Sequence, residues 1–294
     1  MKKIVYRFLI FTLLLIFGLI TYLSTVGIKT AAFNDQISRE VKKIDHVLPN
    51  HKLLLREYQP VNLDKKRAVL YFHGGGYVLS SVDTHDDMVS YMSDSVGVKF
   101  YSLDYRLSPE NKYPDSLDDA LEAYAWLIKQ GFNPKEISVC GDSAGAHLAA
   151  SLVHDLSNRD ENLPASQFLI YPMCDPSCEN ESHELFKEGY LLTKKAMHWF
   201  WEKFQSNNED ELMNTYNLLL YKGEAKIPKT IIVTAGFDPL SDEAENYAFL
   251  LHESGSSVKQ LHYPSLFHGF ASMTRLKAAK KAVNDFLSEY KKIL

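Results

Sequence analysis

Two short glycine-rich motifs contain candidate catalytic residues. Residues 141–145 read Gly-Asp-Ser-Ala-Gly, with Ser143 at the centre, and residues 73–76 read His-Gly-Gly-Gly. The first is the Gly-x-Ser-x-Gly form of a nucleophile elbow, and the second is the form of a loop that offers backbone donors to an oxyanion. Together they predict acyl transfer through a covalent intermediate on Ser143.

An elbow of this kind needs a strand before the serine and a helix after it. Residues 136–140 are a short β-branched and apolar run, typical of a buried strand, and residues 144–154 have a helical pattern. Ser143 therefore falls at a sharp turn that requires small neighbours and places its hydroxyl at a helix N-terminus. A chance match of the motif is the alternative, and the flanking elements argue against it.

The glycines of the second motif have a different expected task. Consecutive glycines let backbone N–H groups approach a substrate oxygen without interference from side chains. We expect the amides of Gly75, Gly76 and Ala144 to bind the oxyanion of a tetrahedral intermediate. The sequence around them lacks the Gly-Lys-Ser/Thr and Gly-x-Gly-x-x-Gly patterns of phosphate-binding loops. We expect His73 to hold the loop by hydrogen bonds rather than to act as a base.

Two later loops supply candidates for the rest of a Ser-His-Asp triad. Asp238 follows a strong strand pattern at 230–235, and His268 lies in the loop after the next predicted strand, 258–263. Catalytic groups gather at the carboxyl ends of strands in open α/β sheets, and the order serine, acid, histidine suits such a fold. We therefore predict Ser143 as nucleophile, His268 as general base and then acid, and Asp238 as the group that orients the imidazole.

Three nearby residues are rivals for these roles. Asp242 and Glu243 lie only a turn beyond the candidate acid, and we interpret them as first-turn acids of the next helix. His262 lies within the last predicted strand, and we interpret it as a packing or surface residue.

With these residues placed, the chain resembles the hormone-sensitive-lipase-like branch of the α/β-hydrolases, which includes bacterial carboxylesterases and the arylacetamide-deacetylase group. Two small departures from that pattern are Ser108, where the family usually has Ala, and Ala146, where it usually has Gly. The motifs follow the family order over about residues 65–290, and they lie at 73–77, 104–110, 141–145, 171–172, 235–240 with 242–243, and 268–270.

The resemblance implies more about the residues around the serine. Tyr77 and Asp142 are expected to bind substrate, and Asp142 is also expected to support the site. Asp104, Tyr105 and Arg106, with Glu110, are expected to support the oxyanion side as a structural motif.

Strands and helices alternate along most of the chain. This order implies an α/β fold, here the α/β-hydrolase fold, with a mostly parallel central sheet and helices on both faces. Strands are predicted near 68–72, 99–104, 137–140, 168–171, 230–235 and 258–263. Helices are predicted at 115–129, 144–155, 241–254 and 276–290.

A helical cap is expected over the site. We assign residues 29–294 to one hydrolase domain whose cap is formed from about 29–55 and 173–228. The second of these segments is rich in aromatic residues, and connections this long between strands are usually functional. An apolar underside would bind an acyl or aryl group and exclude water.

The N-terminus is a separate element. Lys2, Lys3 and Arg7 precede residues 8–28, a run of 21 residues without a charge, and roughly 20 apolar residues span a bilayer. We expect residues 1–28 to be a signal anchor that binds the membrane and holds the catalytic domain on the extracytoplasmic side. Secretion after cleavage of a signal peptide is the alternative, although the run exceeds the usual core of about 7–15 residues.

Charge and cysteine content narrow the partners further. The net charge is −5, and without a long basic run after the N-terminus the chain is not expected to bind nucleic acid. Cys140 is interpreted as a core thiol. Cys174 and Cys178 share one loop, where they form either a small disulfide or two free thiols, and the loop offers too few ligands for a metal site.

The function predicted from these observations is a serine carboxylesterase for esters of small to medium acyl or aryl groups. Such a reaction needs no metal or organic cofactor. An amidase or deacetylase acting on aryl amides is an alternative, since it uses the same triad. A non-catalytic small-molecule-binding protein on a hydrolase scaffold is a second alternative, against which the complete set of triad candidates argues.

Overall fold

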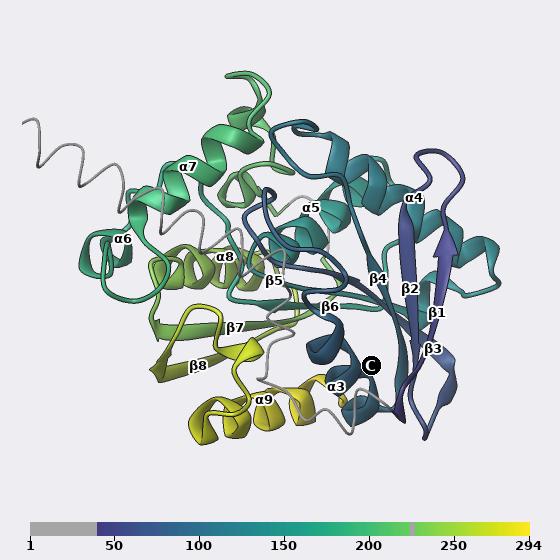
Figure 1. Cartoon of the computed structure of the whole chain (residues 1–294). Coiled ribbons are helices and arrows are strands. Elements are labelled where there is room, and N and C mark those ends of the chain that lie inside the picture. The colour runs from purple at the N-terminus through teal and green to yellow at the C-terminus, as the bar shows by residue number, and fades with distance from the viewer. Residues whose placement is uncertain (1–39, 224–226) are drawn as a thin grey trace, which may run out of the picture.

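An eight-stranded sheet forms the centre of the computed structural model, which describes residues 40–223 and 227–294 (Figure 1). The order across the sheet is β1-β2-β4-β3-β5-β6-β7-β8. The strands are β1 Lys42–Val47, β2 Leu54–Gln59, β3 Asp64–Phe72, β4 Val98–Leu103, β5 Ile137–Asp142, β6 Ser166–Ile170, β7 Lys229–Phe237 and β8 Val258–Phe267.

Strand direction divides the sheet into two parts. The strands from β4 to β8 in this order are mutually parallel, whereas β2 pairs antiparallel with both β1 and β4. All residues of β5 and β6 are buried, as expected for parallel strands that are covered on both faces. The carboxyl ends of the parallel strands meet at one edge of the sheet, where ligands bind in folds of this kind.

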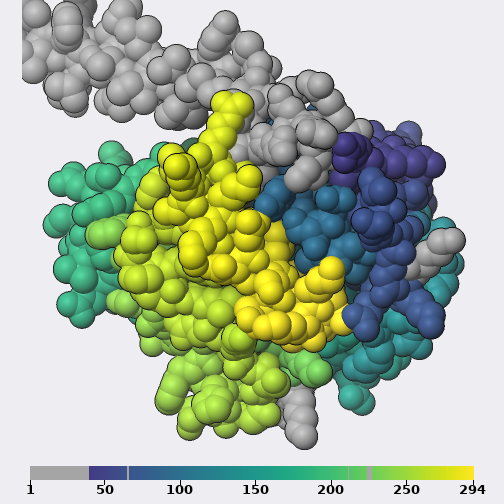
Figure 2. All heavy atoms as spheres, turned by 90° about the horizontal axis from the view of Figure 1, so that it is seen from below, coloured from purple at the N-terminus to yellow at the C-terminus, as the bar shows by residue number. Residues whose placement is uncertain are grey.

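Helices cover the two faces of this sheet. The helices α4 (Asp115–Lys129), α5 (Ala144–Asn158) and α8 (Ser241–Glu253) lie on one face, and α3 (Asp86–Val96) and α9 (Lys277–Tyr290) lie on the other (Figure 1). Figure 2 shows the C-terminal segment, in yellow, beside the blue segment that contains α3. Successive residues of β3 serve the two faces, since Leu70 packs in the core on the α5 side and Tyr71 in the core on the α9 side.

The α/β prediction is confirmed for the main body of the fold. All six strands expected from the sequence are present, and the helix predicted at 115–129 has those bounds in the structure. The other three predicted helices differ from the observed ones by one to three residues at an end.

The structure differs from the predicted cap in its N-terminal part. Residues 29–55 were expected to be part of it, but 42–47 form β1 and 54–59 form β2, both within the sheet. The reason is that β2 buries Leu55 and Tyr58 while it hydrogen-bonds to β4, so it extends the sheet rather than covering the site. Residues 29–39 lie outside the described residues.

The segment between β6 and β7 crosses the carboxyl edge of the sheet. It contains α6 (Glu181–Leu185), α7 (Lys194–Phe204) and two short 3₁₀ helices, Asp210–Leu212 and Leu218–Leu220. Figure 1 shows α6 and α7 above the sheet, on the side of α5 and α8. We call residues 173–223 the cap segment.

No helix within the described residues has the length and apolar character that a membrane crossing requires. The predicted anchor at residues 1–28 lies outside those residues.

Candidate active site

Ser143 lies at the turn between β5 and α5. The strand and the helix predicted around it are both present, and its backbone has φ 55° and ψ −120°, a conformation rare for residues other than glycine. The two flanking glycines are required by space. A Cβ at Gly141 would lie 2.2 Å from the Gly145 carbonyl oxygen, and a Cβ at Gly145 would lie 2.0 Å from the Phe72 carbonyl oxygen.

The structure brings the three predicted triad side chains together. Ser143 Oγ is 3.0 Å from His268 Nε2, and His268 Nδ1 is 2.8 Å from Asp238 Oδ2. The other carboxylate oxygen of Asp238 accepts a hydrogen bond from the Leu240 amide at 2.9 Å. All three triad side chains are buried, so the row of hydrogen bonds is shielded from water. Each bond is electrostatically stronger in this environment than it would be in water.

Each member comes from the carboxyl end of a different strand. Ser143 follows β5, Asp238 follows β7 and His268 follows β8. These ends meet at the carboxyl edge of the sheet, where the site was predicted from the sequence.

The loop of three glycines lies beside the serine in an unusual conformation. Gly75 and Gly76 have φ of 121° and 60°, and a Cβ at Gly75 would lie 2.2 Å from the Leu79 carbonyl oxygen. Ala144 is the first residue of α5, where backbone N–H groups point toward an anion and the helix dipole favours negative charge. These positions suit the predicted oxyanion donors.

Asp142 fastens this loop to the sheet. Its Oδ1 accepts hydrogen bonds from Tyr71 Oη at 2.5 Å and from the Gly74 amide at 2.9 Å, and His85 Nε2 lies 3.5 Å away. Burial acts to raise the pKa of Asp142, but His85 and these two hydrogen bonds outweigh it, so the pKa is lowered. The buried carboxylate therefore carries its charge beneath the loop. A direct contact with substrate stays a prediction.

Tyr77 packs between the loop and the cap segment. Its hydroxyl hydrogen-bonds His147 Nδ1 at 2.5 Å, and its ring stacks on Phe204 of α7 with centroids 3.8 Å apart. The hydroxyl of Tyr77 is thus engaged inside the fold, and a contact between Tyr77 and substrate stays a prediction.

His73 has the structural role that was expected of it. Its Nδ1 hydrogen-bonds the Gly74 carbonyl at 2.8 Å, and burial lowers its pKa to about 3, so the ring is neutral. Tyr105 donates a hydrogen bond to the His73 carbonyl at 2.7 Å and stacks on the imidazole, with centroids 4.3 Å apart. The adjacent Arg106 pairs with buried Asp119 at 2.7 Å, which ties this motif to α4.

The cap segment touches the site on both sides of Ser143. A Cβ at Gly76 would lie 2.3 Å from ring atoms of Phe200, so this ring lies directly against the oxyanion loop. On the other side, Leu191 Cδ2 would lie 3.8 Å from a Cβ at Gly269, the residue after His268. The sequence indicated only that this segment is rich in aromatic residues. It did not indicate that Phe200 or Leu191 lies against the site.

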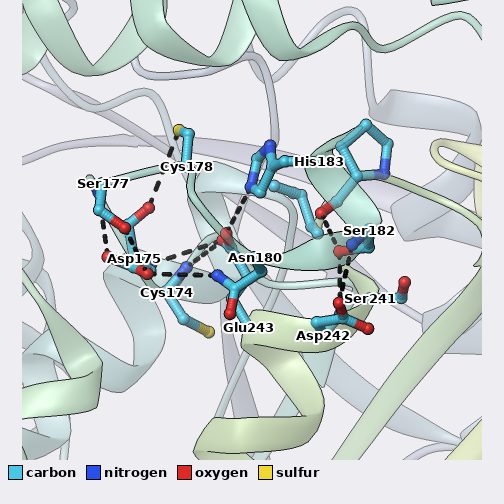
Figure 3. A network of polar contacts seen from close by, with 12 residues as sticks. Cys174, Asp175, Ser177, Cys178, Asn180, Ser182, His183, Ser241, Asp242 and Glu243 are labelled. Carbon is cyan, nitrogen blue, oxygen red and sulfur yellow. Dashed lines mark hydrogen bonds and ion pairs between the residues drawn. The ribbon is translucent and has the colours of Figure 1, made fainter. Parts of the chain in front are cut away.

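A second buried carboxylate connects the cap segment to the loop of the catalytic acid (Figure 3). Glu243 Oε1 accepts a hydrogen bond from the Cys174 amide at 2.7 Å, and its Oε2 is 2.8 Å from His183 Nε2. Both side chains are fully buried. Burial raises the pKa of Glu243 to about 7, and the hydrogen bonds from His183 and Cys174 oppose this only in part.

Neighbouring contacts strengthen this connection (Figure 3). Asp242 Oδ2 accepts from the Ser182 amide at 2.7 Å, and Ser182 Oγ donates to the Pro239 carbonyl at 2.6 Å. Pro239 directly follows Asp238. The first-turn position predicted for Asp242 and Glu243 is therefore confirmed, while their bonds to the cap segment were missed.

The remaining candidates lie apart from the triad. His262 is within β8 and half-exposed, with Nδ1 2.9 Å from Thr234 Oγ1, as expected for a strand residue. Cys140, Cys174 and Cys178 are buried free thiols. Burial raises the pKa of each thiol well above its ordinary value, which keeps them in the unreactive protonated form.

Comparison with known proteins identifies similar sequences and structures. Residues 69–272 match a family described as having the alpha/beta hydrolase fold. Ethyl acetate hydrolase of Pseudomonas putida is 34% identical over 231 residues, which cover 76% of this chain and 73% of that protein. Carboxylic ester hydrolase LipN of Mycobacterium tuberculosis is 31% identical, covering 86% of this chain and 70% of that protein. The crystal structure of a thermostable esterase from Pseudomonas putida has a TM-score of 0.81 at 28% identity, covering 87% of this chain and 83% of the other.

Proposed function

We propose that this chain, which belongs to the alpha/beta hydrolase fold family and is a carboxylic ester hydrolase, cleaves its substrates through Ser143, His268 and Asp238. The observation that supports this proposal is the row of hydrogen bonds at 3.0 and 2.8 Å that links the three side chains. A hydroxyl in this position is activated by the imidazole, which is in turn oriented by the carboxylate.

Acylation is the first half of the proposed reaction. His268 Nε2 removes the proton of Ser143 as Oγ attacks the ester carbonyl carbon. The carbonyl oxygen becomes an oxyanion, which the amides of Gly75, Gly76 and Ala144 stabilise by hydrogen bonds. His268 then gives the proton to the alcohol oxygen, and the carbon–oxygen bond to the alcohol breaks.

Deacylation repeats these steps with water. His268 removes a proton from the water as it attacks the acyl-enzyme, and then returns the proton to Ser143 as the acid leaves. Asp238, held by the Leu240 amide, keeps Nδ1 protonated and Nε2 free to accept. Both halves use only groups of the chain and water.

The proposed substrates are esters with small to medium acyl groups. Two observations support this range. Phe200 lies directly against the oxyanion loop at Gly76, and we expect its ring to limit the room for a long acyl chain. The similar protein from Pseudomonas putida is named for its action on ethyl acetate, an ester with a two-carbon acyl group.

The test is hydrolysis of p-nitrophenyl acetate by the wild type and by Ser143→Ala. Loss of a triad nucleophile lowers turnover by about 10⁶-fold, so the variant should fall to the background rate. Ser257→Ala, at an exposed serine before β8, is the matched control and should keep full activity. A fluorophosphonate probe should label the wild type and the control but not Ser143→Ala. Wild-type activity in Ser143→Ala would overturn the assignment.

We also propose that residues 1–28 anchor the enzyme in a membrane, with the catalytic domain on the extracytoplasmic side. The support is the uncharged run at 8–28 and the basic residues before it. In this case the full chain stays in the membrane fraction after a carbonate wash, and external protease digests the domain in intact cells. Recovery of a shortened chain in the medium would instead support cleavage and secretion.

A further inference from the structure

Four large apolar side chains form an exposed surface next to the site. Tyr190 stacks on Phe237 with centroids 5.1 Å apart, and Phe186 meets Tyr190 and Phe237 edge-on at 5.5 and 5.9 Å. Leu191 completes the group. Leu191 is 70% exposed, and Tyr190 and Phe237 are each 37% exposed. We call these four residues the aromatic rim.

The aromatic rim borders the histidine side of the triad. Phe237 is the residue before Asp238, and Leu191 approaches Gly269, the residue after His268. Tyr190 and Leu191 lie in the connection between α6 and α7. The rim therefore joins the cap segment to the ends of β7 and β8, where the acid and the base are held.

The chemistry of ester cleavage determines which part of a substrate reaches this side. The carbonyl oxygen must point to the amides of the oxyanion loop, and the alcohol oxygen must come within hydrogen-bond distance of His268 Nε2 to receive its proton. The rest of the alcohol then lies on the His268 side of the site, which Leu191 borders through its approach to Gly269. An apolar group that covers the rim removes apolar surface from water on both partners.

We propose that the aromatic rim binds the alcohol part of the ester, so that this enzyme prefers esters of aromatic alcohols over those of small aliphatic alcohols. This inference rests on the proposed function. The flat face of the Tyr190 and Phe237 pair offers stacking to an aryl group, and Leu191 offers an apolar contact next to the histidine.

The experiment compares 2-phenylethyl acetate with ethyl acetate. The two esters share their acyl group and have alcohols of similar basicity, so the ratio of their kcat/KM values reports binding of the phenyl group. Partial burial of the substrate's phenyl group against the aromatic rim should raise kcat/KM about tenfold. The wild type should therefore favour the 2-phenylethyl ester by about that factor.

Tyr190→Ser should reduce this ratio to near one, because it removes the stacking partner of Phe237. Phe249→Ser changes another exposed aromatic residue, on α8 and outside the rim, and should leave the ratio unchanged. A variant that folds poorly would lose activity on both esters together, so the ratio separates a binding effect from a folding effect.

The outcomes distinguish this inference from the proposed function. Hydrolysis of neither ester by the wild type contradicts both. Equal kcat/KM values for the two esters, with activity that depends on Ser143, overturn the rim alone. A change in oligomeric state of Tyr190→Ser, seen by size-exclusion chromatography without a change in the ratio, assigns the rim to an interface between copies and also overturns the inference.

Discussion

The two sides of Ser143 are each held by a buried carboxylate, but the two carboxylates connect different parts of the molecule. On the oxyanion side, Asp142 joins the loop to Tyr71 of β3, within the sheet. On the acid side, Glu243 joins the start of α8 to Cys174 and His183 of the cap segment. The oxyanion loop is thus fixed by the body of the fold, and the loop of Asp238 is fixed together with the cap segment.

The two buried carboxylates also differ in the direction in which their pKa is shifted. Partners lower the pKa of Asp142 despite its burial, whereas burial raises the pKa of Glu243 to about 7. At Asp142 the interaction with His85 and the hydrogen bonds together outweigh burial, whereas at Glu243 the partners His183 and Cys174 do not. We therefore expect the charge of Asp142 to stay constant near neutral pH and the charge of Glu243 to change there.

Among the changes that distinguish the two sides, a displaced donor on the oxyanion side should lower activity most. Gly76→Ala introduces a Cβ that would lie 2.3 Å from the Phe200 ring, so the loop or the ring must move. Misplacement of one oxyanion donor lowers kcat by about 10²–10³-fold, measured by steady-state kinetics on p-nitrophenyl acetate.

Two variants serve as controls for this loss. Gly131→Ala changes another glycine with positive φ, where no atom lies within 4 Å of the added Cβ, and should leave kcat unchanged. Gly76→Ala combined with Phe200→Ala removes the clash and should recover part of the loss. Full activity of Gly76→Ala alone would show that this glycine does not position a donor.

Breaking the acid side should affect stability and turnover together. Glu243→Ala leaves the Cys174 amide and His183 without their partner, and removal of one member of a buried pair costs about 3 kcal/mol of the free energy of unfolding. Denaturant unfolding measures this loss, and kcat should also fall because the loop of Asp238 loses its support.

Matched variants test the specificity of this effect. Glu243→Gln keeps an acceptor for the amide and should cost less than Glu243→Ala, while Glu253→Ala, at an exposed position at the end of α8, should cost little. Loss of stability without any change in kcat would mean that the pair supports the fold but not the catalytic loop.

The stability of the fold should depend on pH through Glu243. The folded-state pKa of Glu243 lies above its ordinary value of 4.5, so the folded state holds this proton more tightly than the unfolded state does. The stabilisation is complete below pH 4.5 and is lost as the pH rises through about 7, a loss of up to about 3 kcal/mol.

Denaturant unfolding at several pH values measures this loss. Glu243→Gln cannot ionise, so its stability should change less over the same pH range than that of the wild type. Parallel curves for the two proteins would contradict the raised pKa.

Selectivity for the length of the acyl group should change less than activity or stability does. Phe200→Ala removes the ring that lies against Gly76 of the oxyanion loop, and removing a steric limit next to a substrate changes selectivity by about tenfold. The ratio of kcat/KM for p-nitrophenyl octanoate over p-nitrophenyl acetate should rise by that factor. Trp199→Ala, at the exposed neighbouring position, should leave the ratio unchanged, and a rise there instead would move the limit to Trp199.

The triad and the parallel sheet could be predicted from the sequence because local signals mark them. Ser143 and Asp238 follow strands with a strong apolar pattern, His268 follows the next predicted strand along the chain, and parallel topology brings such ends to one edge. The β1 strand could not be recognised in this way, since most of its residues are exposed or half-buried and it carries no apolar run.

The contacts of the cap segment were beyond local patterns for a different reason. Glu243 and His183 are 60 residues apart in the chain, and nothing in the residues around either one indicates the partner. The first-turn position of Glu243 was predictable, but its complete burial depends on how the cap segment folds back over α8. Phe200 shows the same limit, because its contact with Gly76 is also tertiary.

The spread of the triad over three strand ends has a consequence for synthesis of the protein. The nucleophile precedes its base by 125 residues, and β8 must join β7 at the edge of the sheet before His268 reaches Ser143. A nascent polypeptide that has folded only through α5 carries an inert serine on the ribosome. Hydrolytic activity therefore reports that translation has passed β8 and that the edge of the sheet is assembled.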